Sequence, residues 1–317
     1  MNKTVLVAVG GNSLIRAGQR GTLEEQRANA RATAAQMAEL VALGCSLVVT
    51  HGNGPQVGAQ LLRTEAGSSQ TYTQPLDVCV AMTQGEIGYL IQNALHDELN
   101  RRGFRLPVVT IITQVLVDRS DPAFSLPLKP IGPFYHEWEA TDKSEELGWQ
   151  MKEDASRGYR RVVPSPEPAA IVEIEAIRKC VENGIIVVTA GGGGIPVAYE
   201  DGALNGVEAV VDKDLISALL ANELGIEEMI ISTDVDFVCR NYAAPNRAPI
   251  RKMTLSEAES YLSEFASGSM RPKIDSAIRF IKRGGNRVHI TSPTHLIDAI
   301  TGNFGTTIER GKGGDET

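Results

Sequence analysis

The sequence predicts an α/β fold, a three-layer αβα sandwich in which helices cover both faces of a mainly parallel central sheet. Short apolar runs of strand length alternate with longer segments of helical periodicity along the 317 residues. Several of the short runs stop at glycine-rich loops that lead into the next helix, which is typical of strand-loop-helix units in a parallel sheet. A chain of this length buries enough surface to be stable without disulfide or metal support.

The expected elements of the N-terminal part follow this alternation closely. The segment Thr22-Leu23-Glu24-Glu25 fits a capping box and predicts a helix start, and Gly44 predicts the end of that helix. The predicted elements in order are a strand at residues 4–9, the helix at 22–44, a strand at 46–50, a helix from Pro55, a helix at 78–102 stopped by Gly103, and a single strand at 107–114.

Residues 117–165 interrupt the regular pattern. Prolines recur at positions 122, 127, 130 and 133, and aromatic residues cluster from Phe134 to Trp149. A segment of this length inside a compact domain is usually functional, so we expect an inserted, protruding subdomain that acts as a lid. The remainder of residues 1–310 forms one domain in this interpretation, and residues 311–317 are expected to be a disordered tail.

Beyond the insert, the alternation resumes. The capping-box pattern at Thr254-Leu255-Ser256-Glu257 predicts one of the helix starts. The predicted elements are a helix at 172–183, a strand at 184–189, a helix from Asp212, a strand at 229–232, the helix from 254, a helix at 276–282, a strand at 287–291, a helix from about Pro293 and a last strand at 306–308.

Composition and charge exclude several classes of protein. The net charge of −8 argues against nucleic acid or an anionic membrane as a partner, since both favour a basic surface. No window approaches eighteen apolar residues, and the N-terminus lacks a signal sequence, so a soluble cytoplasmic protein is expected. The four cysteines are far apart and form no C-x-x-C pair, which is typical of core residues in a reducing compartment.

Three glycine-rich loops are candidate phosphate-binding sites. Each follows a predicted strand, and such loops converge at the carboxyl edge of an open parallel sheet. Glycines leave the backbone free to turn its N–H groups toward an anion. The alternative for the third loop is a flexible segment before a solvated helix cap. The candidate residues are Gly10, Gly11, Asn12, Gly52, Asn53, Gly54, Gly191, Gly192 and Gly193.

A nicotinamide cofactor is disfavoured by the spacing in the second loop. The glycines at 52, 54 and 58 miss the dinucleotide fingerprint by one residue, and no acidic residue follows where a ribose would be bound. The sequence also lacks the Walker A pattern and the protein kinase motifs. Cations for any nucleotide chemistry must therefore come from other segments.

Three lysines in restricted local contexts are the candidates. Lys129 precedes a proline, Lys213 lies between Asp212 and Asp214, and Lys273 follows a proline. Phosphoryl transfer needs positive charge around the migrating group and little covalent assistance, so these lysines suit it. Either Asp214 or Asp212 can hold two lysines in place. Any one of the lysines taken alone is more typical of a solvated surface residue.

Two other groups of polar residues favour structural roles. Arg157, Arg160 and Arg161 are interpreted as a salt-bridged face of the subdomain. His51 lacks an obvious nucleophile or ligand partner and is interpreted as a hydrogen-bonding structural residue.

Ten motifs in this chain resemble those of the carbamate kinases, a branch of the amino acid kinase family. They occur in the expected order over nearly the whole chain, and their combination is highly specific. The motifs are V-A-V-G-G-N-S-L at 7–14, H-G-N-G-P-Q-V-G at 51–58, Q-G-E-I-G-Y-L at 84–90, T-Q-V-L-V-D at 113–118, D-P-A-F at 121–124, K-P-I-G-P-F-Y at 129–135, E-D-A-S-R-G-Y-R-R-V-V at 153–163, G-G-G-G-I-P-V at 191–197, V-D-K-D at 211–214 and G-S-M-R-P-K at 268–273.

The resemblance implies the amino acid kinase fold, a homodimer and a reaction. The implied reaction interconverts ATP plus carbamate with ADP plus carbamoyl phosphate, uses Mg²⁺ with the nucleotide, and makes ATP in the catabolism of nitrogen compounds such as arginine. Lys129 is implied at the transferring phosphoryl group, and Lys213 and Lys273 at the ATP phosphates, with Asp214 orienting the lysines. The first two glycine loops are implied to hold carbamate or the phosphoryl group. Residues implied around the nucleotide are Asp234, Asp236, Tyr242, Met270 and Lys273.

Three positions depart from the resembled pattern. Leu128 replaces a usual threonine, Ser156 a usual glycine, and Arg271 a usual apolar residue. None removes a catalytic group, but Leu128 is expected to affect acceptor binding or rate, and Arg271 to alter nucleotide contacts. Two other functions remain open: an amino acid kinase acting on another carboxylate or phosphate, and a non-catalytic sensor of a nucleotide or carbamoyl phosphate.

Overall fold

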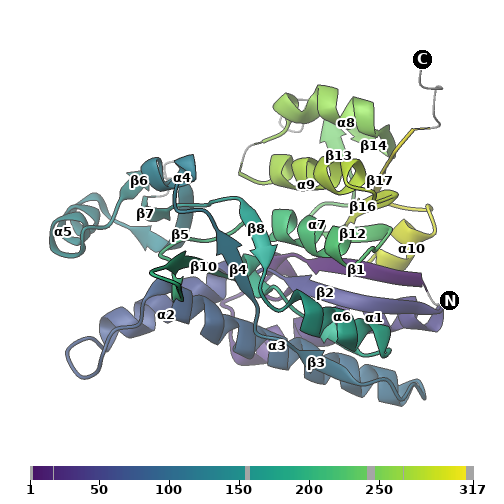
Figure 1. Ribbon diagram of the computed structural model, residues 1–317, viewed down its shortest axis with the longest axis horizontal. Helices are drawn as coiled ribbons and strands as arrows, with labels where there is room; N and C mark the ends of the chain where they lie inside the picture. The colour runs from purple at the N-terminus through teal and green to yellow at the C-terminus, as the bar shows by residue number, and fades with distance from the viewer. Residues whose placement is uncertain (1–2, 17, 154–157, 241–246, 267, 312–317) are drawn as a thin grey trace.

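An eight-stranded sheet runs through the centre of the molecule in the computed structural model (Figure 1), which describes residues 3–16, 18–153, 158–240, 247–266 and 268–311. Six neighbouring strands run parallel, and the last two at one edge run in the opposite direction. The mainly parallel sheet predicted from the sequence is confirmed. Its strands in spatial order are β15 (Lys252–Thr254), β17 (Thr306–Glu309), β16 (Arg287–Thr291), β12 (Glu228–Ser232), β1 (Lys3–Val9), β2 (Cys45–His51), β9 (Ile186–Val188) and β3 (Val108–Thr110).

Helices cover both faces of this sheet, which gives the three predicted layers (Figure 1). Their apolar residues form two large buried clusters, one on each side of the sheet. On one face lie α6 (Ile174–Glu182), α7 (Lys213–Glu223), α8 (Leu255–Tyr261) and α9 (Met270–Lys282). On the other face lie α1 (Leu23–Ala42), α3 (Leu76–Arg101) and α10 (Leu296–Ile300), with α2 (Gly54–Ala66) packed on α3.

Local sequence signals explain where the first long helix begins and ends. Thr22 is the N-cap of α1, its hydroxyl accepts a hydrogen bond from the Glu25 amide at 3.3 Å, and the Glu25 carboxylate accepts one from the Thr22 amide at 2.9 Å. This arrangement satisfies two of the amides that a helix start leaves unpaired. Gly44, just after the helix, has a φ of +86° that favours glycine. The predicted capping box and helix end are confirmed.

The prediction of one strand at residues 107–114 is wrong. The chain forms β3 in the central sheet and then β4 (Gln114–Val117) in a separate four-stranded sheet. Between them, the Thr113 amide and carbonyl are both hydrogen-bonded to the Gln84 side chain, and the Thr113 hydroxyl lies 2.7 Å from that of Thr189. These buried contacts turn the backbone out of the first sheet. They join residues that are distant in the chain, so no local sequence pattern predicts them.

Several short strands were not predicted. The four-stranded sheet has the order β11 (Ala203–Gly206), β10 (Ile195–Glu200), β4 and β8 (Pro168–Ile171). A further hairpin pairs β13 (Val238–Arg240) with β14 (Ala248–Ile250). Strands of three to six residues carry too few positions for a clear alternation, so periodicity alone does not identify them.

A small sheet with one helix protrudes from the main body, within the predicted insert (Figure 1). It contains β5 (Lys129–Tyr135), β7 (Tyr159–Val163) and β6 (Met151–Glu153), with α5 (Glu137–Leu147) at its tip and the short α4 (Pro122–Ser125) before it. Its attachment to α2 is close: a Cβ on Gly58 would lie 3.1 Å from the Gly132 Cα, and Lys143 forms an ion pair with Glu65. We call this part the subdomain.

Some predictions fall outside the described residues. They concern Tyr242, Arg157, Ser156 and residues 312–317 of the predicted tail. Among the described helices, none is both long and apolar enough to cross a membrane.

Candidate active site

The first two glycine-rich loops meet at the carboxyl edge of the central sheet, as the sequence predicts. A Cβ on Gly52 would lie 2.7 Å from the Gly11 amide nitrogen, and a Cβ on Gly10 would lie 2.8 Å from the Ser232 carbonyl oxygen. Only glycine allows backbones to approach this closely. The two loops therefore form one rim of exposed backbone, which borders a cavity of about 580 Å³.

The third glycine-rich loop contributes less to this cavity than the sequence suggests. All three glycines are buried, and of them only Gly192 lines the cavity. A Cβ on Gly191 would collide with the His51 ring, and one on Gly193 would lie 2.0 Å from the Val211 carbonyl oxygen. The Gly193 amide donates a hydrogen bond to the Ala190 carbonyl at 3.2 Å. At these two positions, glycine is required by packing.

The three predicted lysines converge on the same cavity from remote segments. Lys129 comes from β5 of the subdomain, Lys213 begins α7, and Lys273 lies in the first turn of α9. Three cations in one cavity beside glycine-loop backbone form a site for a polyanion. Of the predicted glycine-loop residues, Gly11, Gly52, Asn53, Gly54 and Gly192 line this cavity.

Asp214 holds two of these lysines. Its Oδ1 lies 2.9 Å from Lys213 Nζ, and its Oδ2 accepts a hydrogen bond from Lys273 Nζ at 3.2 Å. Burial opposes ionisation of Asp214, but the charges of Lys213 and Lys273 hold the pKa of this carboxyl well below its usual range. Burial likewise opposes the charge of Lys273, and Asp214 raises its pKa above the usual value. Asp214 and Lys273 therefore stay charged at neutral pH.

Asp212 holds the third lysine. Its Oδ2 accepts a hydrogen bond from Lys129 Nζ at 2.9 Å, while its Oδ1 accepts one from the Asp214 amide at 2.9 Å and so caps α7. One carboxylate thus joins the subdomain to the helix that carries Lys213. The sequence offered Asp212 and Asp214 as alternative partners for the lysines, and the structure uses both.

Lys213 has unused hydrogen-bonding capacity. Its ammonium nitrogen is inaccessible to solvent, and its contact with Asp214 does not have hydrogen-bond geometry. A buried ammonium without aligned acceptors is costly, so its donors suit an anion in the cavity.

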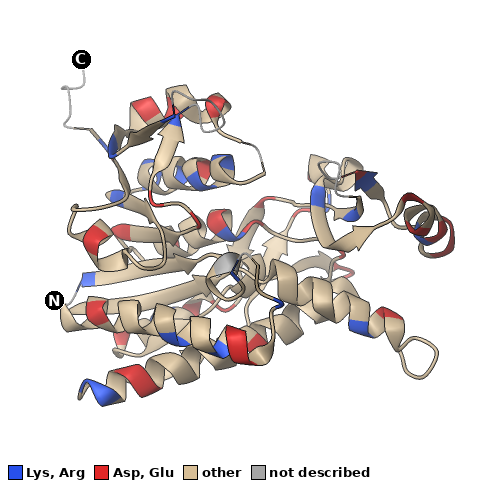
Figure 2. Ribbon diagram, turned by 180° about the vertical axis from the view of Figure 1, so that it is seen from behind, with Lys and Arg blue, Asp and Glu red and all other residues tan. Residues whose placement is uncertain are grey.

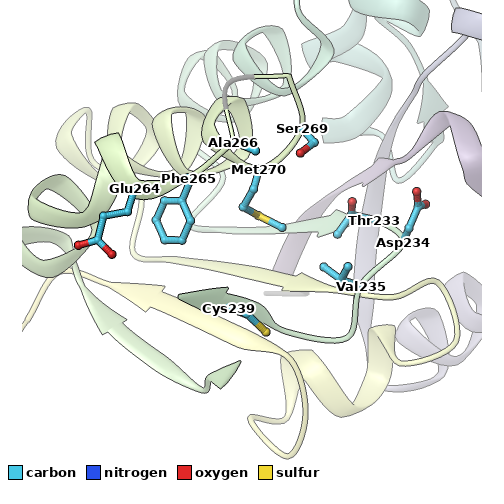
Figure 3. A pocket seen from close by; sticks show the side chains of 9 residues that line it. All are labelled: Thr233, Asp234, Val235, Cys239, Glu264, Phe265, Ala266, Ser269 and Met270. Atoms are coloured by element: carbon cyan, nitrogen blue, oxygen red, sulfur yellow. The ribbon is translucent and has the colours of Figure 1, made fainter. Parts of the chain in front are cut away.

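A second cavity of about 250 Å³ shares one lining residue, Ser269, with the first. In Figure 3, Met270 and Phe265 face Val235 and Cys239 across it, and Asp234 lies at one end. A mostly apolar pocket with a few polar groups beside a cationic site suits a nucleotide base and sugar. Of the predicted nucleotide residues, Asp234 and Met270 line it.

Asp236 and Lys273 do not line this smaller pocket. The Asp236 carboxylate accepts a hydrogen bond from the Ser292 hydroxyl at 2.6 Å, and Lys273 borders the larger cavity instead. The structure also adds Ser269, which lies in the G-S-M-R-P-K motif, and Thr233 and Phe265, which no motif contains because they meet only in the folded chain.

A third cavity of about 840 Å³ borders the Lys129–Asp212 pair. It shares Lys129, Arg160 and Asp212 with the 580 Å³ cavity, and we call it the outer chamber. Leu128 and Arg271, two of the three departures from the resembled motifs, both line it. Arg271 does not border the smaller pocket, so no direct contact supports the expectation that it alters nucleotide binding.

The predicted arginine face is only partly internal to the subdomain. Arg161 pairs with Glu208 of the main body at 2.7 Å, and the other Glu208 oxygen accepts a hydrogen bond from the Leu76 amide at the start of α3. Arg160 donates to the Gly132 carbonyl at 3.2 Å within the subdomain. Arg161 therefore ties the subdomain to the main body.

His51 is buried behind the rim. Its Nδ1 lies 3.1 Å from the Gly52 carbonyl oxygen, and burial, assisted by the charge of Lys213, lowers its pKa to about 4. The ring is therefore neutral at physiological pH, which supports a structural role.

Among the described residues, no group of three or more His, Cys, Asp or Glu side chains is arranged to hold a metal ion. The carboxylates nearest the cavity, Asp212 and Asp214, are both engaged by lysines. Fold and site together define a kinase, an enzyme that moves a phosphoryl group between a nucleotide and a small acceptor.

Comparison with known proteins makes the assignment specific. Residues 3–292 match the model of the amino acid kinase family. The carbamate kinase of Pyrococcus horikoshii is 50% identical over 97% of this chain and 99% of its own length, and carbamate kinase 2 of Enterococcus faecalis is 45% identical over 96% and 98%. The structure of carbamate kinase from Giardia lamblia bound to AMP-PNP matches with a TM-score of 0.91 at 40% identity, covering 97% of this chain and 98% of that one. The chain belongs to the amino acid kinase family and, within it, to the carbamate kinases.

Proposed function

We propose that this enzyme interconverts ATP plus carbamate with ADP plus carbamoyl phosphate, and that it works in the direction of ATP synthesis during the catabolism of nitrogen compounds such as arginine. The observation that carries this proposal is the convergence of Lys129, Lys213 and Lys273 on one cavity beside a rim of glycine backbone. The identity to carbamate kinases over nearly the full chain supports the choice of acceptor.

In the proposed mechanism, the lysines neutralise the migrating phosphoryl group. Its transition state spreads negative charge over the equatorial oxygens, and fixed cations stabilise that charge without reorganising. Asp214 stays ionised, since its pKa is held well below the usual range, and so keeps Lys213 and Lys273 directed at the phosphates. Lys129 approaches from the subdomain side.

The acceptor needs no general base. Carbamate attacks through a carboxylate oxygen that carries no proton at neutral pH, so catalysis requires positioning and charge stabilisation alone. We propose that the backbone of Gly11 and Gly52 to Gly54 holds this small anion. His51 fits this scheme as a structural residue: the carbamate oxygen carries no proton for a base to remove, and His51 is buried.

We propose that Mg²⁺ enters with the nucleotide and is ligated mainly by its phosphates. The described residues provide no cluster that would hold the ion independently, and the two nearby aspartates already bind lysines. Bound there, the ion would neutralise phosphate charge. The chain's own contribution is to position the lysines around that complex.

We also propose a cytoplasmic homodimer. Residues Val78, Met82 and Tyr89 lie on one face of α3 and are 38%, 39% and 54% exposed. β3 beside this helix is the edge strand of the central sheet, and edge strands are commonly covered in native proteins. The four cysteines are free thiols, which suits a reducing compartment. Sedimentation equilibrium should give twice the chain mass of 34.1 kDa, and a Met82→Glu/Tyr89→Glu variant should sediment as a monomer.

The reaction is tested by coupling ATP formation to a reporter enzyme. The chain should form ATP from ADP and carbamoyl phosphate, and it should use acetyl phosphate and other acyl phosphates far less well. Preference for another acyl phosphate would reassign the acceptor within the family. Tight ADP binding with no turnover on any of them would favour a sensor.

A further inference from the structure

The outer chamber contains more positive than negative side chains. Its lining includes four cations and two carboxylates, in a chain whose net charge is −8. Figure 2 shows Lys and Arg positions in blue on the strands of the subdomain and on α9. The cations are Lys129, Lys152, Arg160 and Arg271, and the carboxylates are Asp212 and Asp275.

Both carboxylates are already neutralised. Asp212 pairs with Lys129 at 2.9 Å, and Asp275 pairs with Arg279 at 3.0 Å. Within the described part of the chain, neither Lys152 nor Arg271 has a carboxylate at ion-pair distance. The chamber therefore keeps an excess of positive charge on two opposite walls.

On the subdomain wall, two cations are placed side by side. Lys152 of β6 is paired directly with Arg160 of β7 in the antiparallel ladder, so both side chains stand on the same face of the sheet. Lys152 therefore stands beside a second cation on this wall of the chamber.

On the other wall, Arg271 is held in a fixed orientation. Its Nε donates to the Phe265 carbonyl at 3.1 Å and one terminal nitrogen donates to the Ser263 carbonyl at 3.0 Å. These bonds use part of the guanidinium fork and leave further N–H donors for the chamber that Arg271 lines. The neighbouring apolar side chains of Leu128, Leu215 and Leu262 strengthen attraction to an anion by lowering the local dielectric constant.

We propose that the outer chamber is a vestibule for the small phosphorylated substrate, in which Lys152 and Arg271 bind the phosphate before it passes the Lys129–Asp212 pair. This inference rests on the proposed function and adds a binding step to it. The two other cavities share Ser269 and suit the nucleotide and its phosphates, which leaves the outer chamber for the approach of the second substrate. Its ligand class is a small phosphate dianion, carbamoyl phosphate in the reaction above.

The test compares Lys152→Gln and Arg271→Gln with the wild type in ATP formation at saturating ADP, from low to high ionic strength. Each variant should lower kcat/KM for carbamoyl phosphate by roughly 3- to 10-fold at low salt, and the difference should fade at high salt because the attraction is screened. The KM for ADP should not change. Arg283→Gln, an exposed arginine at the C-cap of the same helix α9, is the matched control and should behave as the wild type.

Arg271→Lys separates charge from anchoring. Lysine keeps the positive charge but cannot reproduce the pair of hydrogen bonds to the Phe265 and Ser263 carbonyls. This variant should retain most of the wild-type kcat/KM. If it is as impaired as Arg271→Gln, or if the KM for ADP rises in parallel, the arginine acts by anchoring Phe265 and the proposal is wrong. Unchanged kcat/KM in both glutamine variants would also overturn it.

Calorimetric titration with inorganic phosphate tests the chamber without turnover. The wild type should bind phosphate more tightly than the Lys152→Gln/Arg271→Gln double variant in the absence of nucleotide. Equal affinity would overturn the vestibule whatever the enzyme catalyses. A wild type that binds phosphate in this way but forms no ATP would instead contradict the proposed function.

Discussion

The two halves of the cleft hold their lysines differently. In the main body, Lys213 and Lys273 are 12% and 16% exposed and share the buried carboxylate of Asp214. In the subdomain half, Lys129 is 37% exposed and bonds to Asp212, which also caps α7. The first arrangement is fixed by burial and paired charge, whereas the second is a single bond between two parts of the fold.

This difference suggests a division of labour. Two largely shielded lysines around one ionised aspartate form a cationic surface that is organised before substrate arrives, which is the condition for strong electrostatic stabilisation. Lys129 is the most exposed of the three lysines and is held by one carboxylate, so it is the lysine that can most readily exchange its partner for a phosphoryl group. The main body therefore provides the preformed half of the site, and the subdomain provides the adjustable half.

The largest expected effect comes from Asp214→Asn. Loss of this charge leaves Lys213 and Lys273 without their counter-ion, and kcat for ATP formation should fall by roughly 10²- to 10³-fold. Asp142→Asn, the same change at an exposed position of α5, should leave kcat unchanged. A kcat within a few-fold of the wild type in a folded Asp214→Asn protein would contradict the claim that Asp214 organises Lys213 and Lys273 for catalysis.

Asp212→Asn should have a smaller effect on kcat, roughly 10-fold, since it removes only the ion pair with Lys129. Asparagine is also a good N-cap, so the free energy of unfolding should change little. Asp212→Ala removes the cap as well and should lose about 1 kcal/mol of unfolding free energy in urea titrations. If Asp212→Asn lowered kcat as much as Asp214→Asn does, the lysine of the subdomain and the two lysines of the main body would not differ in the way proposed.

His51 predicts a pH dependence of stability for the main body. Its folded pKa of about 4 lies below the unfolded value near 6.5, so the unfolded state binds more protons between these values and stability falls as pH falls. The wild type should lose about 2 kcal/mol of unfolding free energy between pH 7 and pH 5 from this residue. His51→Asn should show a correspondingly flatter profile in urea titrations at each pH, and an identical slope would show that His51 is not buried neutral.

Thr22→Ala gives the smallest effect and separates capping from catalysis. The capping box of α1 lies away from the lysines, and its loss should reduce the unfolding free energy by about 1 kcal/mol with kcat unchanged. Asp212→Ala removes a cap of the same kind but should also reduce kcat. If Thr22→Ala lowered kcat as well, the effect of Asp212 would be attributable to helix stability alone.

How far the sequence predicted the fold depended on whether the signal was local. The first strand-loop-helix units, the capping boxes and the parallel sheet were predicted because each leaves a pattern within a few residues. The change of sheet between β3 and β4 was missed, since it depends on Gln84 and Thr189, which are distant in the chain from Thr113.

The site shows the same limit. The convergence of the three lysines could be predicted from motifs, but the assignment of Asp212 to Lys129 and of Asp214 to the other two could not. Glycine at 191 and 193 predicted a phosphate-binding loop. In the structure, glycine is required there because a Cβ would collide with the His51 ring at 191 and with the Val211 carbonyl at 193. Arg271 is positioned in the outer chamber by its hydrogen bonds to the carbonyls of Ser263 and Phe265. No sequence pattern predicts these two bonds.

The central claim is that Lys129 joins the preformed lysines at the migrating phosphoryl group, and the turnover of Lys129→Ala tests it most directly. Coupled assays of ATP formation from ADP and carbamoyl phosphate should show kcat reduced by roughly 10²-fold or more, with ADP binding intact. Turnover equal to that of the wild type would contradict the claim.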